Sequence, residues 1–376
     1  MQGKYSVGID ISKKDFKVCF VILDQDQEIQ IKSSRKFSNT VKGCESFKKW
    51  HKNHQKEDLP IVFVMEATGS YHEHLAWYLY QDKQQLSVVL PNRSKAYMIS
   101  LGLKSKNDKV DAKGLAMMGA VQKLRVWQPI SKQIYNLRAL TRHLEDLQKI
   151  RTSLMNQQEQ PKYAMYELKD VSRSIVSTLK TIDKQIAGCK KKIHAIIAKD
   201  VVLKKKVSHI TSIKGVSTMT AAVVIGETNG FALINNLKQL TSYAGYDVKE
   251  NQSGSRTGKT RITKKGNAHI RRAMHLPAFG VVRWHVKSFE NLHKRVYGRT
   301  GLKMKAYVAV QAKLLRLIYT LWSKETDFDL NYQTSVNQEG TKTLIKQVDK
   351  ETARSKDPAA RDELIAVKTT SPLLVV

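Results

Sequence analysis

The spacing of apolar residues changes along the chain, and this change limits the possible folds more than any other feature. Up to about residue 125, short apolar runs of strand length alternate with turns and amphipathic stretches. From about 131 to 200, glycine almost disappears and apolar residues recur at intervals of four and three. The first pattern is typical of an α/β domain, and the second of long paired helices. We therefore expect an α/β domain followed by a coiled-coil region.

The first region opens with two apolar segments, 5–11 and 16–23, joined by a short turn. This arrangement predicts a strand hairpin, to which 30–37 adds a third strand. Two further strands are expected at 61–65 and 86–90, separated by stretches of helical period. A hairpin followed by alternating strands and helices predicts a mixed sheet with helices packed on it.

The heptad region predicts two long helices with a bend near Pro161, which pack as an antiparallel hairpin or pair with another subunit. Its seam consists of Ile175, Leu179, Ile182, Ile186, Cys189, Ile193 and Ile196. Beyond it we expect a mostly helical domain that contains a glycine turn at 213–217, and a flexible polar tail. The expected domains are 1–125, 126–206, 207–328 and 329–376.

The charge of the chain indicates its partner. It has 65 Lys and Arg against 33 Asp and Glu, a formal charge of +32. Such a surface repels itself unless a polyanion neutralises it, so DNA or RNA is expected to bind. No apolar run is long enough to cross a membrane, and the three cysteines lie far apart without metal-ligand spacing. We expect reduced thiols and a cytosolic protein without a leader.

Four acidic residues differ from the rest in their placement. Asp10 and Glu66 end apolar strands, and Asp108 and Asp111 stand three apart, on one face of an expected helix. Each alone could be a turn, cap or surface residue. Acids on the first strand, on a middle strand and on a later helix form a ribonuclease-H-like layout. Charges at the ends of buried strands are costly unless something pairs them. A shared Mg²⁺ would pair them, since this hard cation prefers carboxylate oxygens.

Other chemistries fit less well. Sugar kinases open with a similar strand, but the turn at 12–15 has no glycine through which backbone could approach a phosphate. The histidines lack convergent zinc spacing. Trp77, Trp284 and Trp322 are expected to lie in the core rather than to stack on bases.

Several motifs together resemble the DEDD-type transposases of bacterial insertion sequences, which are described as bridge-RNA-guided recombinases. The resemblance runs from residue 5 to about 325 in a constant order. The motifs are Gly8-Ile9-Asp10-Ile11-Ser12-Lys13, Glu66-Ala67-Thr68-Gly69-Ser70-Tyr71, Lys106-Asn107-Asp108-Lys109-Val110-Asp111-Ala112, Ile213-Lys214-Gly215-Val216, Ser253-Gly254, Ile262-Thr263-Lys264-Lys265-Gly266-Asn267 and Ile270-Arg271-Arg272-Ala273.

The resemblance implies a RuvC-like first domain whose four acids hold Mg²⁺, and a helical C-terminal domain whose serine attacks a DNA phosphate. By motif position this serine is Ser253, with Ser255 as the nearby alternative. It also implies a structured guide RNA that pairs with donor and target DNA, a homodimer or tetramer, and a bacterial cytoplasm, near the nucleoid, as the location.

The remaining predicted residues are basic groups that would contact nucleic acid around the serine. They are Arg256, Lys259, Arg261, Lys264, Lys265, Arg271 and Arg272. Two alternatives stay open: a metal-dependent nuclease or junction resolvase that forms no covalent intermediate, and a non-catalytic nucleic-acid scaffold.

Overall fold

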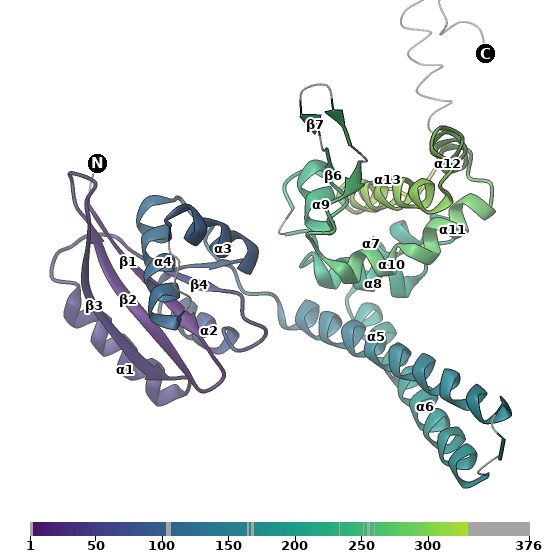
Figure 1. The fold of residues 1–376 in the computed structure, drawn as a ribbon, viewed down its shortest axis with the longest axis horizontal. Helices are drawn as coiled ribbons and strands as arrows, with labels where there is room; N and C mark the ends of the chain where they lie inside the picture. Colours follow the sequence, from purple (N-terminus) through teal and green to yellow (C-terminus); the bar gives the residue numbers. More distant parts are fainter. Residues whose placement is uncertain are drawn as a thin grey trace, which may run out of the picture. The chain divides into compact units, whose positions relative to one another are not determined.

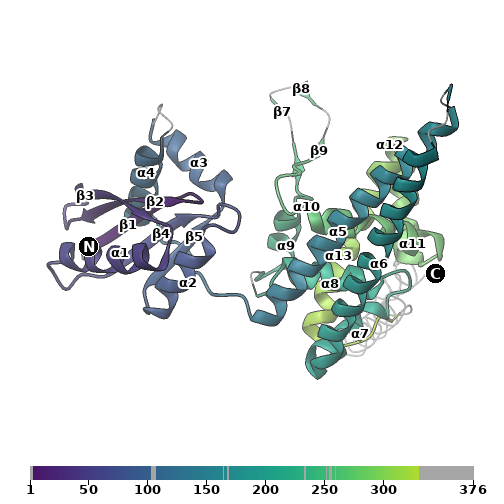
Figure 2. The same ribbon diagram turned by 90° about the horizontal axis from the view of Figure 1, so that it is seen from below.

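The computed structural model describes residues 3–102, 107–163, 165–166, 169–232, 234–250, 252–253, 256–258 and 260–329. The chain divides into two compact units, and the boundary falls between Ile130 and Ser131 (Figures 1 and 2). Apart from Asp329, the expected polar tail lies outside the described residues. No helix in the described part of the chain has both the length and the apolar character needed to cross a membrane.

The first unit contains a five-stranded sheet in the order β3-β2-β1-β4-β5. β1 and β3 are antiparallel to β2, whereas β4 is parallel to β1 and β5 is parallel to β4. The mixed sheet confirms the expected hairpin and the α/β fold class of the first region. The strands are β1 (Lys4–Ile11), β2 (Asp15–Leu23), β3 (Ile29–Ser38), β4 (Ile61–Glu66) and β5 (Gln85–Val89).

Helices cover both faces of this sheet. One face packs against α1 and α2 through a large apolar cluster that includes Phe16, Phe20, Phe47 and Phe63. The other face packs against α4 through smaller side chains, among them Ala112 and Ala116. The helices of this unit are α1 (Val41–His54), α2 (Glu73–Gln81), α3 (Pro91–Ser100) and α4 (Asp108–Val121).

Helix α4 lies unusually close to β1. A Cβ atom on Gly8 would stand 2.1 Å from the carbonyl oxygen of Ala112 and 2.2 Å from the amide nitrogen of Ala116. Two residues earlier, the Ser6 hydroxyl donates a hydrogen bond of 2.7 Å to the carbonyl oxygen of Ala116. Only glycine therefore allows the helix backbone to rest directly on the middle of the strand.

The second unit is mostly helical, as expected. Its two longest helices, α5 and α6, run side by side in opposite directions (Figures 1 and 2). The base of this helical hairpin shares one apolar core with the remaining helices. The helices are α5 (Lys132–Glu159), η1 (Gln160–Tyr163), α6 (Lys169–Lys199), α7 (Val201–Thr211), α8 (Thr218–Glu227), α9 (Leu237–Ala244), α10 (Ala268–Ala273), α11 (His275–Arg283), α12 (Lys287–Thr300) and α13 (Lys303–Lys324).

Two features of this unit differ from expectation. The segment expected to be a loop between α9 and α10 contains two short antiparallel ladders, β6 (Val248–Lys249) with β9 (Arg261–Ile262) and β7 (Gln252–Ser253) with β8 (Arg256–Thr257). Strands of two residues are too short to show an apolar alternation by which they could be recognised.

The expectation for the tryptophans is partly wrong. Trp322 is partly buried and packs against the core of the second unit, beside Phe231. Trp77 and Trp284 are 48% and 57% exposed. Trp284 directly follows the last residue of α11, where the helix no longer carries side chains toward the core.

We expect Gly8→Ala to lower the free energy of unfolding by about 1–3 kcal/mol, because the added methyl group overlaps the backbone of α4. Chemical denaturation measures the change. Gly188→Ala is the matched control, since nothing lies within 4 Å of a Cβ at this position in α6. The control should gain up to about 1 kcal/mol from helix propensity. Equal stability of the two variants would contradict the close contact.

Candidate active site

Asp10 and Glu66 lie next to each other on the face of the sheet that α4 covers. β1 and β4 are parallel with Ile9 opposite Met65, so the following residue of each strand is also a neighbour. Side chains alternate along a strand. The buried Ile9 and Met65 therefore face α1 and α2, and the two half-buried acids face the other way.

Helix α4 brings the other two acids to the same end of the sheet. Asn107 caps the helix, and its side-chain oxygen accepts a hydrogen bond of 2.9 Å from the amide of Val110. Asp108 and Asp111 occupy the first turn, where the positive end of the helix dipole favours acids. Because Ala112 rests on Gly8, this first turn lies above the end of β1 that carries Asp10.

The crowding of acids changes the ionisation of Asp10. Burial, followed by the charges of Asp111, Asp108 and Glu66, raises the pKa of Asp10 from 3.8 to about 6. Lys17 is the neighbour that opposes the rise. A carboxyl group surrounded by three others is a charge arrangement that a bound cation stabilises.

Lys17 is a contact that the sequence reasoning missed. It stands opposite Asp10 on β2, and its ammonium group lies 2.9 Å from a carboxylate oxygen of Asp108. This ion pair lowers the pKa of Asp108 and raises that of Lys17. The register of the hairpin was the signal that could have predicted it.

Ser94 is a second residue that the sequence did not indicate. It is fully buried in α3, and its hydroxyl donates a hydrogen bond of 2.5 Å to Glu66. The bond holds the Glu66 carboxylate in one orientation while leaving its other oxygen available. No sequence pattern marked this serine, because its role depends on how α3 packs beside β4.

The four acids offer the donor chemistry of a magnesium site, since every candidate ligand is a carboxylate oxygen. In the described residues, no three His, Cys, Asp or Glu side chains are close enough to share an ion as they stand. Asp108 is instead turned to Lys17. The type and the position of these acids suit a divalent cation. The ammonium group of Lys17 neutralises part of their negative charge.

Ser253 lies in the second unit, on the β7–β8 hairpin. It is exposed and pairs across the ladder with Arg256. Ser255, the alternative nucleophile, lies outside the described residues. The hairpin presents Ser253 to solvent, where a DNA backbone could reach it.

The predicted nucleic-acid contacts fall into two groups. Arg261, Lys264 and Lys265 are exposed. Arg271 instead donates hydrogen bonds to the carbonyl oxygens of Ala244 and Gly266, and Arg272 pairs with Glu145. Lys259 lies outside the described residues, as does the side chain of Arg256.

Glu227, a buried acid at the end of α8, binds side chains from α5 and from the segment that precedes α10. Its carboxylate accepts two hydrogen bonds from Arg142, of 2.7 and 2.8 Å, and one of 2.6 Å from Asn267. Asn267 also caps α10. Although burial alone would raise it, the pKa of Glu227 is lowered by these bonds. The pattern of the sequence gave no sign of this network.

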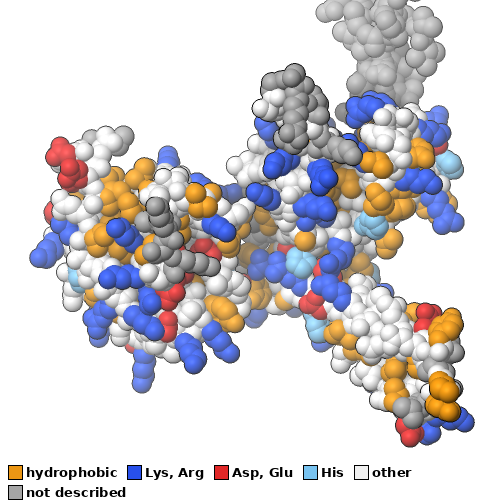
Figure 3. Space-filling view, in the orientation of Figure 1, with side chains coloured by type: hydrophobic (Ala, Val, Ile, Leu, Met, Phe, Trp, Pro, Cys, Tyr) orange, Lys and Arg blue, Asp and Glu red, His pale blue; other side chains and the backbone are white. Residues whose placement is uncertain are grey.

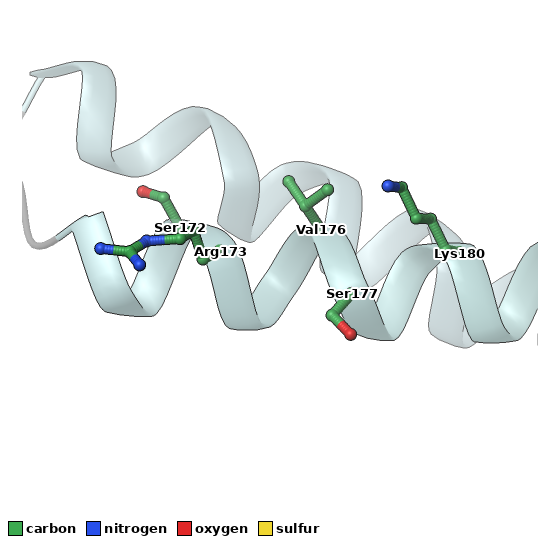
Figure 4. Close-up of a pocket in the computed structure, with 5 residues that line it drawn as sticks. All are labelled: Ser172, Arg173, Val176, Ser177 and Lys180. Carbon is green, nitrogen blue, oxygen red and sulfur yellow. The ribbon is translucent and has the colours of Figure 1, made fainter.

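The surface is hollowed away from these residues too. A hollow of about 390 Å³ lies on α6, lined by Ser172, Arg173, Val176, Ser177 and Lys180 (Figure 4). It contains none of the predicted site residues. Another, of about 560 Å³, lies along α11.

Comparison with known proteins places the chain among transposases. A model of the DEDD transposases of the IS110 type matches residues 7–160, and a model described as the transposase IS116/IS110/IS902 family matches residues 207–294. Two curated relatives, the pilin gene-inverting proteins of Moraxella lacunata and Moraxella bovis, are each 29% identical over 335 residues. That alignment covers 87% of this chain and 98% of each relative.

Solved structures resemble parts of the chain weakly. RuvC of Thermus thermophilus is 10% identical, with a TM-score of 0.26, and the match covers 33% of this chain and 99% of RuvC. The fowlpox virus Holliday junction resolvase is 16% identical, with a TM-score of 0.24 over 31% of this chain and 99% of the resolvase.

We expect Asp10→Asn to stabilise the protein when divalent cations are absent. A folded-state pKa of about 6, above the ordinary 3.8, means that ionising Asp10 destabilises the fold. Stability should fall as pH rises from 4 to 6, and the penalty is complete above 6. With solvent screening, removing it should contribute about 1 kcal/mol at pH 7.5.

Thermal unfolding with and without Mg²⁺ measures this effect. The melting temperature of the native protein should rise with Mg²⁺, and that of Asp10→Asn should respond far less. Asp82→Asn is a control, because Asp82 pairs with Lys48 and has a lowered pKa. An Asp10→Asn variant that is less stable than the native protein at pH 7.5 would refute the crowding of the acids.

Proposed function

We propose that Ser253 and a magnesium site carry the chemistry of this chain. The chain belongs to the IS110 family of DEDD-type insertion-sequence transposases, which makes it an enzyme that cuts and rejoins DNA. The observation that supports the proposal most strongly is the placement of Asp10, Glu66, Asp108 and Asp111 at one end of one sheet face. These four acids come together in a chain with a formal charge of +32. Lys and Arg side chains are spread widely over the face drawn in Figure 3.

In the proposed reaction the Ser253 oxygen attacks a DNA phosphorus. The hydroxyl gives up its proton, an oxygen–phosphorus bond forms, and the bond from phosphorus to one deoxyribose oxygen breaks. The departing deoxyribose oxygen takes a proton. The hydroxyl of another cut strand then attacks the phosphoserine and gives up its proton, and the serine oxygen leaves and takes a proton, which joins the two DNA strands. No external oxidant or energy source is needed, because each step exchanges one phosphodiester for another.

The acids of the first unit would hold Mg²⁺, which when bound stabilises charge on the phosphate oxygens. Ser94 orients Glu66, and Lys17 keeps Asp108 ordered before the cation arrives. In the second unit, the exposed Arg261, Lys264 and Lys265 would hold the DNA backbone close to Ser253. A structured non-coding RNA would select donor and target DNA by base pairing in the bacterial cytoplasm.

We expect a covalent protein–DNA adduct when the protein is incubated with its element-end DNA, the flanking non-coding RNA and Mg²⁺. A denaturing gel detects it. Ser253→Ala should abolish the adduct, because no oxygen remains to attack, and Asp10→Ala should lower its yield at least a hundredfold. Ser255→Ala is the matched control and should retain the adduct.

The other outcomes separate the alternatives. Cleavage without an adduct, unaffected by Ser253→Ala, would identify a metal-dependent nuclease or resolvase. Salt-dependent binding of DNA with no cleavage, unchanged by Asp10→Ala, would identify a scaffold. Loss of the adduct in Ser255→Ala but not in Ser253→Ala would identify Ser255 as the nucleophile. Omission of the RNA tests the guide: an unchanged adduct yield would reject it.

We further propose that the α5–α6 hairpin joins two copies of the chain. Ile186, Cys189 and Ile193 of the seam are buried, but Ile175, Leu179 and Ile182 keep the same spacing and are only half-buried. α5 therefore leaves part of the seam open, and a matching helix of a second copy would cover it. At the hairpin tip Tyr163, Met165 and Tyr166 are 89%, 88% and 79% exposed.

Replacing Met165 and Tyr166 by serine should weaken the dimer at least tenfold, because apolar area is no longer buried between copies. Sedimentation velocity over a concentration series measures the association. Ile99→Ser, which changes an exposed apolar residue of α3, is the control and should leave association unchanged. A native protein that stays monomeric at all concentrations would overturn the proposal.

A further inference from the structure

An exposed tryptophan lies at the end of α11. Trp284 is 57% exposed, although burial of an indole is among the largest apolar gains available to a side chain. Leu276, near the start of the same helix, is 76% exposed. Neither residue takes part in the core or in the candidate active site. An uncovered pair of this kind indicates a binding surface.

Between these two residues the surface is hollowed. The hollow of about 560 Å³ is lined by Leu276, Phe279, Gly280, Arg283 and Trp284. A Cβ atom on Gly280 would lie 3.4 Å from the Cα atom of Gly215, so this glycine lets the 213–217 turn pack closely against α11. Phe279 is backed by Tyr307, with ring centroids 3.8 Å apart and nearly parallel planes. The hollow thus has two aromatic walls, Phe279 and Trp284, and the Phe279 wall is supported from behind by Tyr307.

The charges at this hollow are positive. Arg283 lines it, and the ammonium group of Lys214 lies 4.6 Å from the centre of the Trp284 ring. No carboxylate lines the hollow. Lys214 is brought there by the turn of residues 213–217, in which Gly215 has a φ of +100° and lies against Gly280. A side chain on Gly215 would be strained in that conformation and would crowd α11.

We propose that this hollow binds an unpaired nucleobase of a single-stranded nucleic acid. The base stacks on the ring of Trp284. Leu276 and Phe279 contact the edges of the base. Arg283 and Lys214 form ion pairs with the adjoining phosphates. Aromatic residues beside cationic ones are the usual means of holding single strands, since every base has a stacking face. A duplex hides these faces inside its base stack, so it cannot use the tryptophan.

The inference rests on the proposed function only in taking a nucleic acid as the substrate. Recombination exposes unpaired bases when strands are cut and exchanged. The hollow would hold such a strand away from its former partner. Its binding requires neither Ser253 nor the acids of the first unit, so it can be tested without catalysis.

Fluorescence anisotropy with labelled oligonucleotides tests the proposal in the full-length protein at fixed salt. The probes are a short oligothymidylate, an oligouridylate of equal length and a DNA duplex of that length. Trp284→Ala should weaken binding of a single strand about 5- to 100-fold, as loss of one stacked base does. Trp284→Phe should restore part of the affinity, and duplex binding should stay within twofold. Trp77→Ala, at the other exposed tryptophan, is the matched control.

The two single-stranded probes separate the source of the base, because a loss confined to the ribose probe identifies the RNA and a loss confined to the deoxyribose probe identifies DNA. Equal loss for duplex and single strand, or no loss, would overturn the proposal. The proposal would also be overturned if Trp284→Ala bound the single strands normally but lost self-association, because the hollow would then bind a second copy of the chain. If Ser253→Ala forms the normal adduct while Trp284→Ala loses single-strand binding, the proposed nucleophile fails and this site stands.

Discussion

The direct contact between α4 and β1 determines the chemistry of the first unit. Gly8 allows the helix backbone to lie on the strand, and the Ser6 hydroxyl ties the Ala116 carbonyl to the same strand. Gly119 continues the contact one turn further, where a Cβ would stand 2.4 Å from the Ser6 hydroxyl oxygen. Only small groups lie between this helix and the strand, so the two backbones approach closely. The acidic first turn of the helix therefore lies above the carboxyl end of the sheet.

Two acidic centres in this chain show opposite solutions to the cost of a buried charge. Glu227 receives hydrogen bonds from Arg142 and Asn267, so its pKa is lowered and it stays ionised in a closed network. Burial and the charges of Asp111, Asp108 and Glu66 raise the pKa of Asp10, and the charge of Lys17 opposes the rise. A satisfied network contributes to structure. An unsatisfied group of acids carries repulsion that a cation can relieve, which is why we propose a catalytic role for Asp10 and not for Glu227.

The sequence predicted those parts of the fold that depend on local pattern. Apolar runs located the five strands of the first unit. Strand-end position was enough to select Asp10 and Glu66. Ser94 and Glu227 escaped notice because their roles arise from contacts between distant segments. Trp284 was misjudged for a related reason: residue type predicts burial on average, but the end of a short helix decides which way a side chain points.

The high net charge of the chain does not show which basic side chains are free to contact DNA. Arg271 is bound to the backbone carbonyls of Ala244 and Gly266, and Arg272 to Glu145. These guanidinium groups hold the loop that precedes α10 against the rest of the unit. The exposed Arg261, Lys264 and Lys265 stand on the surface that they support. A phosphate would therefore meet lysines and arginines on a loop that is already rigid, and less conformational entropy is lost when DNA binds.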